Sequence, residues 1–376
     1  MLDMEAIKNF SIDKSDWKKV KFGDVVFEPK ESVKDPVAEG IEHVVGLEHI
    51  DSGDMHLRRS ASIEESTTFT KKFSKGDVLF GRRRAYLKKA AKASFEGICS
   101  GDITVMRARE ELLLPELLPF IVNNEKFFDH AITHSAGGLS PRVKFKDLAK
   151  FELNLPSPKV QESLLKLFLS LDEVVEANKL ILQRLRVAKG KDFELLLTQS
   201  DGEMMPLSKV LKQKKDKSQV PHKRLKYIGL EHIESGEFHC SKFGDSSEAQ
   251  AQCYLIDKGD LCYSKLRPYL DKAFIADFDA VSTTELLVYE TTLASKEYVL
   301  HHLHSKPFIH YVSGKGFGTK MPRVNHKIVG EYEVKVLSDE TPVLDKMALY
   351  SRTEKDALRK INKNIELHRN LINKVF

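Results

Sequence analysis

The sequence has few cysteines and no recognisable metal site. Its 376 residues include four cysteines, none in a C-x-x-C pair or near histidines at a zinc-binding spacing: Cys99, Cys240, Cys253 and Cys262. We expect buried or incidental thiols in a reducing compartment. Histidines cluster at His301, His302 and His304, but no acidic partner and no i, i+4 histidine pair around a glutamate accompanies them. We therefore expect the surface of a helix there and no bound metal.

Long apolar runs and a strong charge of one sign are also missing. No window approaches 18 uninterrupted apolar residues, and the N-terminal MLDMEAIKNF has no basic region followed by an apolar stretch. We therefore expect no membrane span and no signal peptide, and a soluble, cytoplasmic protein. The net charge is only +5, from 60 basic and 55 acidic residues, so net charge alone does not indicate a nucleic-acid binder. The length and the 41% hydrophobic content predict more than one core.

Motifs for methyl transfer and nucleotide hydrolysis are absent as well. The chain has neither a Gly-rich S-adenosylmethionine turn nor the aromatic motif that a DNA methyltransferase needs. The closest approach to a phosphate-binding loop is GKGFGTK (314–320), in which Thr319 occupies a position that requires glycine. The segment also lacks a preceding strand, so we expect no nucleotide site.

What the sequence does contain is an internal repeat. GLEHIDSG and GLEHIESG begin at residues 46 and 229, an offset of 229 − 46 = 183. The same offset relates KGDVLF (75–80) to KGDLCY (258–263) and RAYLKKA (84–90) to RPYLDKA (267–273). At an offset of 322 − 141 = 181, SPRVKFKDLAKFELNL (140–155) maps onto MPRVNHKIVGEYEVKV (321–336). Two ancestral copies explain these matches.

The repeat also bears on a candidate nuclease motif. Glu333 followed by Lys335 superficially fits the acidic pattern of a nuclease, but the corresponding segment of the first copy is ELN (152–154). A shared active site is therefore not expected, and we predict no catalytic residue in the chain.

Both copies have the same order of elements. Short runs rich in β-branched and aromatic residues come first and predict strands, as in VKFGDVVF (20–27), EHVVGL (42–47), DVLFG (77–81) and DITVM (102–106). A helical stretch (115–132 or 295–312), a Gly-rich loop (135–142 or 313–323) and a last strand follow. The pattern predicts an α+β chain with tandem α/β domains at 1–156 and 201–338.

A long helix follows each domain, over 157–200 and 339–376. Apolar residues alternate at spacings of four and three, which is the a/d seam of a coiled coil. The predicted seam is Leu164, Phe168, Leu171, Val175, Asn178, Leu182 and Leu185 in the first helix, and Leu358, Ile361, Ile365, His368, Ile372 and Val375 in the second. Pro156 and Pro158 precede the first helix and Pro342 begins the second, where a missing N–H costs nothing.

Each seam needs a partner, and the other helix can supply it. Because the chain passes through the second domain before the second helix begins, we expect antiparallel pairing about a pseudo-twofold axis, with the domains at opposite ends. In the alternative arrangement, each helix packs separately onto its own domain.

Basic and aromatic residues occupy equivalent positions in both copies. After the strand DVLF, the first copy has Arg82, Arg83, Arg84, Tyr86, Lys88 and Lys89, and the second has Lys265, Arg267, Tyr269 and Lys272. The Gly-rich loops and their flanks add Arg142, Lys144, Lys315, Lys320 and Arg323. Arginine reads guanine in the major groove and both cations neutralise phosphates, so we predict a DNA-binding face. The alternatives are a solvated charged hairpin or, for Arg84 with Arg267 and Arg142 with Arg323, residues that support the fold.

Several of these motifs together resemble one family. GLEHIDSG, KGDVLFGRRR and LSPRVKFKDLAKFELNLPSPKVQESLLKLFLSLDEVVE are similar to the target-recognition domain and following helical region of type I restriction-modification specificity subunits. The proline-containing junction of that family, in which Gln-Glu precedes a long helix, resembles PSPKVQES (156–163), although the spacing between proline and glutamine is not P-x-x-x-Q-E. The second junction, VLSDETPVLDKM (336–347), departs from this pattern, while the resemblance covers nearly the whole chain.

The resemblance implies a function without chemistry in this chain. Each recognition domain would read one half of a bipartite, asymmetric site in double-stranded DNA. The helices would act as a ruler and as a platform for two modification subunits. Those partners would bind S-adenosylmethionine, and restriction subunits, where present, would use ATP and Mg²⁺; no cofactor is expected on this chain. The alternatives are a helical adaptor that binds proteins instead of DNA, or an enzyme of unrecognised type.

Overall fold

The computed structural model describes residues 11–63, 68–318 and 320–376, so the first ten residues of the predicted first domain and Thr319 lie outside the described residues. The chain forms two compact units. Unit 1 comprises the chain up to Leu180 together with Ala357–Phe376, and unit 2 comprises Ile181–Asp356. Each long helix is therefore shared between the units. The predicted domain boundaries at 156/157, 200/201 and 338/339 stay predictions.

Unit 1 contains two small sheets and a separate strand pair. The strand orders are β2-β9-β6-β7 and β4-β3-β8-β5, and β1 pairs with β10. All of these pairs are antiparallel except β3 with β8. The strands are β1 (Lys18–Lys21), β2 (Val26–Phe27), β3 (His43–Val45), β4 (Ala61–Ser62), β5 (Lys71–Phe73), β6 (Val78–Gly81), β7 (Ala90–Lys92), β8 (Gly97–Cys99), β9 (Ile103–Ala108) and β10 (Glu152–Leu155).

Short helices pack against these sheets. They are α2 (Phe22–Val25), η1 (Leu47–His49), η2 (Ala85–Leu87), η3 (Pro115–Leu117), α3 (Leu118–Val122), α4 (Glu125–Thr133) and α5 (Phe145–Leu148). The predicted helical stretch 115–132 is broken before α4, where the side chain of Asn124 caps the helix by accepting a hydrogen bond from the Lys126 N–H at 2.8 Å. The main core joins Phe80 of β6 to Phe127 and Phe128 of α4.

The prediction of one strand over 20–27 is wrong. The helical turn α2 interrupts the run between β1 and β2. The Asp24 carboxylate accepts a hydrogen bond from the Lys21 N–H at 2.9 Å, which favours a turn at this point. Phe22 and Val25, three residues apart, are both fully buried, as the period of a helix allows and that of a strand does not.

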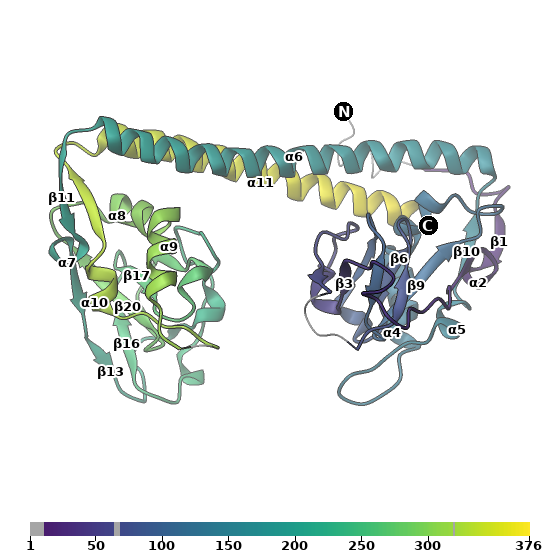
Figure 1. Ribbon diagram of the computed structural model, residues 1–376, viewed down its shortest axis with the longest axis horizontal. Helices are drawn as coiled ribbons and strands as arrows, with labels where there is room; N and C mark the ends of the chain where they lie inside the picture. Colours follow the sequence, from purple (N-terminus) through teal and green to yellow (C-terminus); the bar gives the residue numbers. More distant parts are fainter. Residues whose placement is uncertain (1–10, 64–67, 319) are drawn as a thin grey trace. The chain divides into compact units, whose positions relative to one another are not determined.

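Unit 2 repeats this arrangement. The order β12-β20-β17-β18 matches the first sheet of unit 1, and β15-β14-β19-β16 matches the second, which β13 extends by one strand. The strand β11 pairs with β21, and Figure 1 labels β11, β13, β16, β17 and β20 among these strands. Its elements are β11 (Gly202–Pro206), α7 (Leu207–Val210), β12 (Leu211–Lys214), β13 (Lys217–Ser218), β14 (Lys226–Ile228), η4 (Leu230–His232), β15 (Gly244–Asp245), η5 (Ser246–Glu248), β16 (Cys253–Ile256), β17 (Leu261–Ser264), η6 (Pro268–Leu270), β18 (Ala273–Ile275), β19 (Ala280–Ser282), β20 (Leu286–Thr291), α8 (Lys296–Leu303), α9 (Lys306–Lys315), α10 (His326–Gly330) and β21 (Glu333–Leu337). The structure therefore confirms the mixed α+β fold and its repetition.

The two long helices are α6 (Pro158–Gln199) and α11 (Thr341–Val375), of 42 and 35 residues. They pair with each other. In unit 1 the ring centroids of Phe168 and His368 lie 6.1 Å apart. In unit 2 Lys189 donates to Glu354 at 3.2 Å and the Tyr350 hydroxyl donates to Asp192 at 2.7 Å. Because the partner's number falls along α11 as the number rises along α6, the pairing is antiparallel, as predicted.

The predicted seam is turned inward along both helices. Leu164, Phe168, Val175, Leu182, Ile361, His368, Ile372 and Val375 are buried, and Leu171, Asn178, Leu185, Leu358 and Ile365 are half-buried. The sequence pattern missed Leu367 and Leu371, which are also buried in the core of unit 1. The end of α11 thus packs against α6 and against the sheets of unit 1 at once. The helices therefore pair with each other, and the alternative in which each helix packs separately onto its own domain does not hold here.

The structure also bears on the expectations about the cysteines and about membrane-spanning segments. All four cysteines are buried and unpaired with one another. Among the described residues, no helix combines the length and the apolar character that crossing a membrane requires.

Candidate nucleic-acid interface

A strained turn follows β6 in unit 1 and β17 in unit 2. In unit 1 the turn η2 has Arg84 before it and Lys88 after it, with φ angles of 54° and 49°. In unit 2 the equivalent residues Arg267 and Asp271 both have φ of 50°. Residues other than glycine rarely adopt this left-handed conformation, and it persists only where the surroundings enforce it. Both copies retain the same two strained positions, which indicates that the turn itself matters.

The turn presents a tyrosine to solvent. Tyr86 and Tyr269 occupy equivalent positions, and each is 51% exposed. An exposed aromatic ring is costly to leave in water without a partner and supplies a flat surface for a sugar or a base. The turn therefore offers the same aromatic group in both units.

Backbone hydrogen bonds join this turn to the Gly-rich loop. In unit 1 the Arg84 N–H donates to the Pro141 carbonyl at 2.8 Å, and the Val143 N–H donates to the Arg82 carbonyl at 3.0 Å. The loop itself is closed by a reciprocal pair of bonds between Ala136 and Arg142 at 2.9 Å. We call residues 82–88 and 136–143 the paired loops of unit 1. The structure thus brings together two basic segments that are far apart in sequence.

Unit 2 has the same connections. The Arg267 N–H donates to the Pro322 carbonyl at 2.7 Å, and the Val324 N–H donates to the Lys265 carbonyl at 3.0 Å. Phe317 and Arg323 close the loop. Residues 265–271 and 317–324 are the paired loops of unit 2. The frame is therefore the same although few side chains are.

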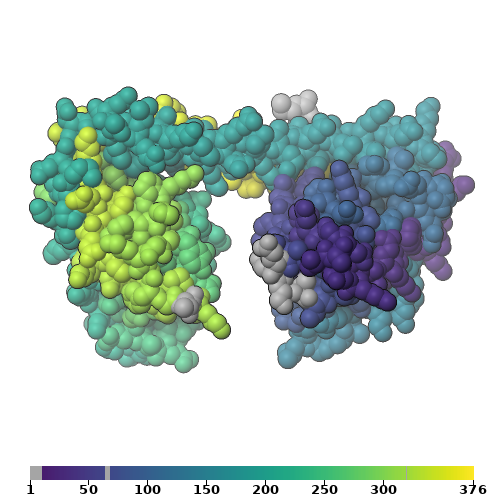
Figure 2. Space-filling model, viewed as in Figure 1, coloured from purple at the N-terminus to yellow at the C-terminus, as the bar shows by residue number. Residues whose placement is uncertain are grey.

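The tips of the Gly-rich loops are exposed. Gly137 and Gly318 adopt φ of 115° and 98°, which only glycine tolerates readily. Leu139 is 98% exposed in unit 1, and Phe317 is 53% exposed in unit 2. In the space-filling view the light-green segment of this loop lies at the surface of unit 2 (Figure 2).

Some of the predicted basic residues are available to a ligand. Arg84, Lys144 and Lys320 are exposed, and within the described part of the chain their side chains make no hydrogen bond or ion pair. Lys265 is half-buried and its side chain is equally unengaged among the described residues. Within the described residues, the fold itself does not use the charges of these four cations.

Other predicted basic residues are engaged by the protein. Lys88 pairs with Glu125 of α4, and Lys89 donates to the Leu47 carbonyl at 2.7 Å. Lys272 makes the same bond as Lys89, to the Leu230 carbonyl at 2.6 Å, so this contact belongs to the fold. Lys315 pairs with Glu331 at 3.2 Å and lies over the ring of Tyr311. The Arg82 Nε donates to the Val143 carbonyl at 3.1 Å.

Three further predicted arginines, Arg83, Arg142 and Arg323, bind carboxylates that the sequence patterns did not single out. The Nε of Arg267 is buried and has no hydrogen-bond partner within the described residues. In unit 1 Asp102 accepts from Arg142 at 2.7 Å and from Arg83 at 3.3 Å. In unit 2 Glu285 accepts from Arg323 at 3.2 Å. The hydrogen bond from Arg142 lowers the pKa of the Asp102 carboxyl, so this group is ionised at neutral pH. The repeat offset of 285 − 102 = 183 is the signal that could have identified the two acidic residues.

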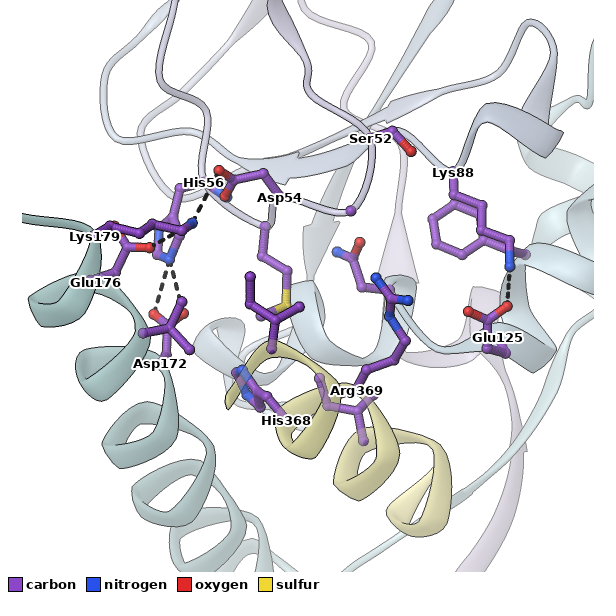
Figure 3. A pocket seen from close by; sticks show the side chains of 17 residues that line it. Ser52, Asp54, His56, Lys88, Glu125, Asp172, Glu176, Lys179, His368 and Arg369 are labelled. Atoms are coloured by element: carbon purple, nitrogen blue, oxygen red, sulfur yellow. Dashed lines mark hydrogen bonds and ion pairs between the residues drawn. The ribbon is translucent and has the colours of Figure 1, made fainter. Parts of the chain in front are cut away.

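A cavity of about 240 Å³ lies in unit 1 between the loop 52–58, α6 and the end of α11 (Figure 3). His56 contacts Asp172 of α6 at 2.9 Å, and this hydrogen bond raises the pKa of His56. Arg58 pairs with Glu176 at 2.8 Å, and Lys179 also pairs with Glu176. These contacts join the loop to the helix.

The same cluster is the candidate for a metal ion. Ligand atoms of His56, Asp172 and Glu176 lie within 4.8 Å of one another. However, Glu176 already accepts two hydrogen bonds from Arg58 at 2.8 and 3.0 Å. A cation would have to displace that guanidinium, so we interpret the group as an ion-pair network.

The expectation that His301, His302 and His304 form a helix surface is wrong. His302 is 4% exposed, and burial lowers its pKa to about 4. His301 packs on Phe238 with ring centroids 4.5 Å apart, and burial lowers its pKa to about 3. His304 contacts Asp271 at 2.7 Å. The three rings pack against Phe193, Phe238 and Asp271 instead of facing water.

The chain was compared with known proteins. No family model and no curated protein matches it. Among solved structures it is similar to proteins of type I restriction-modification systems.

Three of these structures illustrate the similarity. One comes from a study of complex assembly and conformational transition of the type I R-M system; it is 18% identical, with 96% of this chain and 97% of that chain covered and a TM-score of 0.49. The HsdS subunit from Thermoanaerobacter tengcongensis is 18% identical over 98% of each chain, with a TM-score of 0.42. The S subunit of the type I restriction-modification system from M. genitalium is 12% identical over 98% of each chain, with a TM-score of 0.49.

Proposed function

We propose that the chain is the DNA-specificity subunit of a type I restriction-modification complex. Unit 1 and unit 2 each contribute one reader, and each reader contacts one half of a bipartite site through its paired loops. One observation carries the proposal. Both units have the same strained turn, joined by backbone hydrogen bonds to a Gly-rich loop, but the two copies expose different side chains.

The conserved and variable positions of the paired loops have the distribution that two readers of different sequences need. The exposed tyrosine, the strained arginine before it and the loop proline are the same in both units. Arg82 is replaced by Lys265, and Leu139 at the loop tip is replaced by Lys320. Base readout depends on the side chains at the tips, whereas the frame only places them.

The long helices supply a surface for partner subunits. Their seam is buried, yet α6 exposes apolar side chains along its outer side: Leu169, Val174 and Leu180 in unit 1, and Ile181, Val187 and Leu195 in unit 2. Exposed apolar groups of this number are typical of a protein interface. We propose that two modification subunits dock there, in the cytoplasm, and that they contribute the methyl-transfer chemistry.

The chain itself, in this proposal, performs no reaction. The cofactors belong to the partners, S-adenosylmethionine to the modification subunits and ATP with Mg²⁺ to any restriction subunits. The free cations Arg84, Lys144 and Lys320 serve to hold the phosphate backbone of double-stranded DNA.

A selection from randomised duplex DNA tests the proposal. The full chain, purified from its host with the subunits that accompany it, should enrich a motif of two short specified segments separated by an unspecified spacer. Its affinity for the selected duplex should fall steeply between about 50 mM and 200 mM salt. Enrichment of no motif, together with stable co-purification of other proteins, would favour the helical adaptor instead.

A further inference from the structure

We propose that a carboxylate in each unit fixes the Gly-rich loop in its DNA-reading conformation, Asp102 in unit 1 and Glu285 in unit 2. The inference rests on the proposed function and assigns Arg142 and Arg323 to the same task. These four residues are positioning residues: they act on the DNA through the loop and not by touching it.

In unit 1, Asp102 connects three elements at one point. It directly precedes β9, and its backbone carbonyl accepts a hydrogen bond from the Arg82 N–H at 2.9 Å. Its carboxylate accepts from Arg142 twice, from Nε at 2.7 Å and from Nη2 at 3.4 Å. Arg83 donates to the same carboxylate at 3.3 Å and to the Ser140 hydroxyl at 3.2 Å. The start of β9, the strained turn and the Gly-rich loop therefore meet at one acidic side chain.

Unit 2 preserves this connection with a longer acid. Glu285 directly precedes β20, and its backbone carbonyl accepts from the Lys265 N–H at 2.9 Å. Its carboxylate accepts from the Nε of Arg323 at 3.2 Å. Leu266 stands where unit 1 has Arg83, so the second arginine is absent from this position. What the two units share is one carboxylate and one loop arginine.

The loop arginine is fixed at both ends. The backbone of Arg142 closes the loop through its pair of bonds with Ala136, while Asp102 holds its side chain at the start of β9. When the Nε and Nη2 groups of an arginine both donate to one carboxylate, the planar guanidinium is held in one orientation. The tip residues between Ala136 and Arg142 are thereby held in one conformation before DNA arrives, which reduces the ordering cost of binding.

The affinity for DNA of a variant without the Asp102 carboxylate distinguishes two roles of Arg142, positioning the loop and binding a phosphate directly. Asp102→Ala raises the net charge by one and frees Arg142. If Arg142 bound phosphate, affinity would rise and the salt dependence would become steeper by about one ion. If Asp102 positions the loop, affinity for the selected duplex falls in spite of the added charge.

The experiment uses the full chain purified with its accompanying subunits and the randomised duplex library. We expect Asp102→Ala to lose sequence preference in one half of the motif only and to weaken binding of the wild-type duplex by about 10-fold, the value of one base contact. Asp102→Glu should recover binding, because unit 2 uses glutamate at this position. Arg142→Lys, which keeps the charge and loses the side-on fork, should behave like Asp102→Ala. Glu285→Ala is the matched control and should affect the other half.

The failures are distinguishable. A wild-type chain that selects no motif overturns the proposed function and this inference with it. A wild-type motif that Asp102→Ala selects unchanged, with equal or higher affinity, overturns the positioning role alone. Full binding by Arg142→Lys would do the same, because only the charge would then be needed. The unaffected half of the motif reports whether each variant is folded.

Discussion

Residues of one type have different partners in the paired loops and directly beside them. Arg84 is exposed and makes no side-chain contact within the described residues, whereas Arg142 is bound to Asp102. Lys144 is free in the same sense, whereas Lys89 is bound to the Leu47 carbonyl. Charge alone therefore does not identify a DNA contact. Cations with a partner inside the protein stabilise the fold. Under the proposed function, the cations without such a partner are the ones that bind phosphates.

The exposed tyrosines give the most direct prediction at this scale. Tyr86→Ala should weaken binding of the selected duplex by about 10-fold by removing one stacking surface, and the loss should be confined to one half of the motif. Tyr269→Ala is the matched variant and should affect the other half. Competition binding with duplexes mutated in either half measures both. Equal loss in both halves from a single substitution would contradict the assignment of one reader to each unit.

His56 gives a pH dependence of stability. Its pKa is raised above the ordinary value by the hydrogen bond with Asp172, so the protonated form is favoured in the folded state. The stabilisation is therefore fully present below the unfolded pKa of about 6.5 and is lost as pH rises through the higher, folded pKa. Asp172→Asn should reduce the loss of thermal stability between about pH 6 and pH 9.

The measurement is thermal unfolding of wild type and variant across that range. His368, which also lines this cavity, has its pKa lowered to about 4 by burial and so stays neutral throughout. Identical pH profiles for the two proteins would show that the contact between His56 and Asp172 contributes nothing to folding.

At the residue scale, the sequence indicated which basic and aromatic residues to consider but not which side chains they contact. The exposed tyrosines and the free Arg84 follow from the repeat and the basic run. The pairing of Arg142 with Asp102 does not, because it joins residues 40 apart that meet only after the sheet forms. The ion pairs of His56 and Arg58 with α6 have separations of 116 and 118 residues and no local signal.

The long helices are the elements that the sequence predicts best. Heptad spacing over many turns is a strong local signal, and the observed bounds of α6 and α11 lie within two residues of the predicted ones. The short run 20–27 was predicted wrongly because β-branched and aromatic residues favour strands, while a turn bond from Asp24 and the burial of Phe22 decide otherwise. Leu367 and Leu371 escaped notice because a heptad pattern reports only one face of a helix that is buried on two.

The double burial of α11 has a measurable consequence. Leu371 is 1% exposed in the core of unit 1, so Leu371→Ala should lower the free energy of unfolding by about 2–5 kcal/mol through loss of apolar contacts and a cavity. Leu349 of the same helix is 57% exposed, and Leu349→Ala should change it by less than about 0.5 kcal/mol. Denaturant titration compares them. A small effect of Leu371→Ala would mean that the end of α11 does not belong to the folded core.

In the proposed function, the whole molecule contains two copies of one DNA-reading domain. The two units have corresponding sheets, with one additional strand, β13, in unit 2. They share the strained turn and the backbone hydrogen bonds that join it to the Gly-rich loop, and they differ at the exposed tips. A duplicated frame with divergent tips suits an asymmetric DNA site, because each half can change its sequence preference without altering the fold. The repeat itself was visible in the sequence, whereas the joining of the loops required the structure.

The most direct test of this central claim is a map of methylated positions in the host genome, with and without this gene. The account predicts methylation of one asymmetric motif, with two specified segments and an unspecified spacer, that disappears when the gene is deleted and returns when it is restored. A methylation map that is unchanged by the deletion would contradict the claim that this chain directs modification to its DNA site.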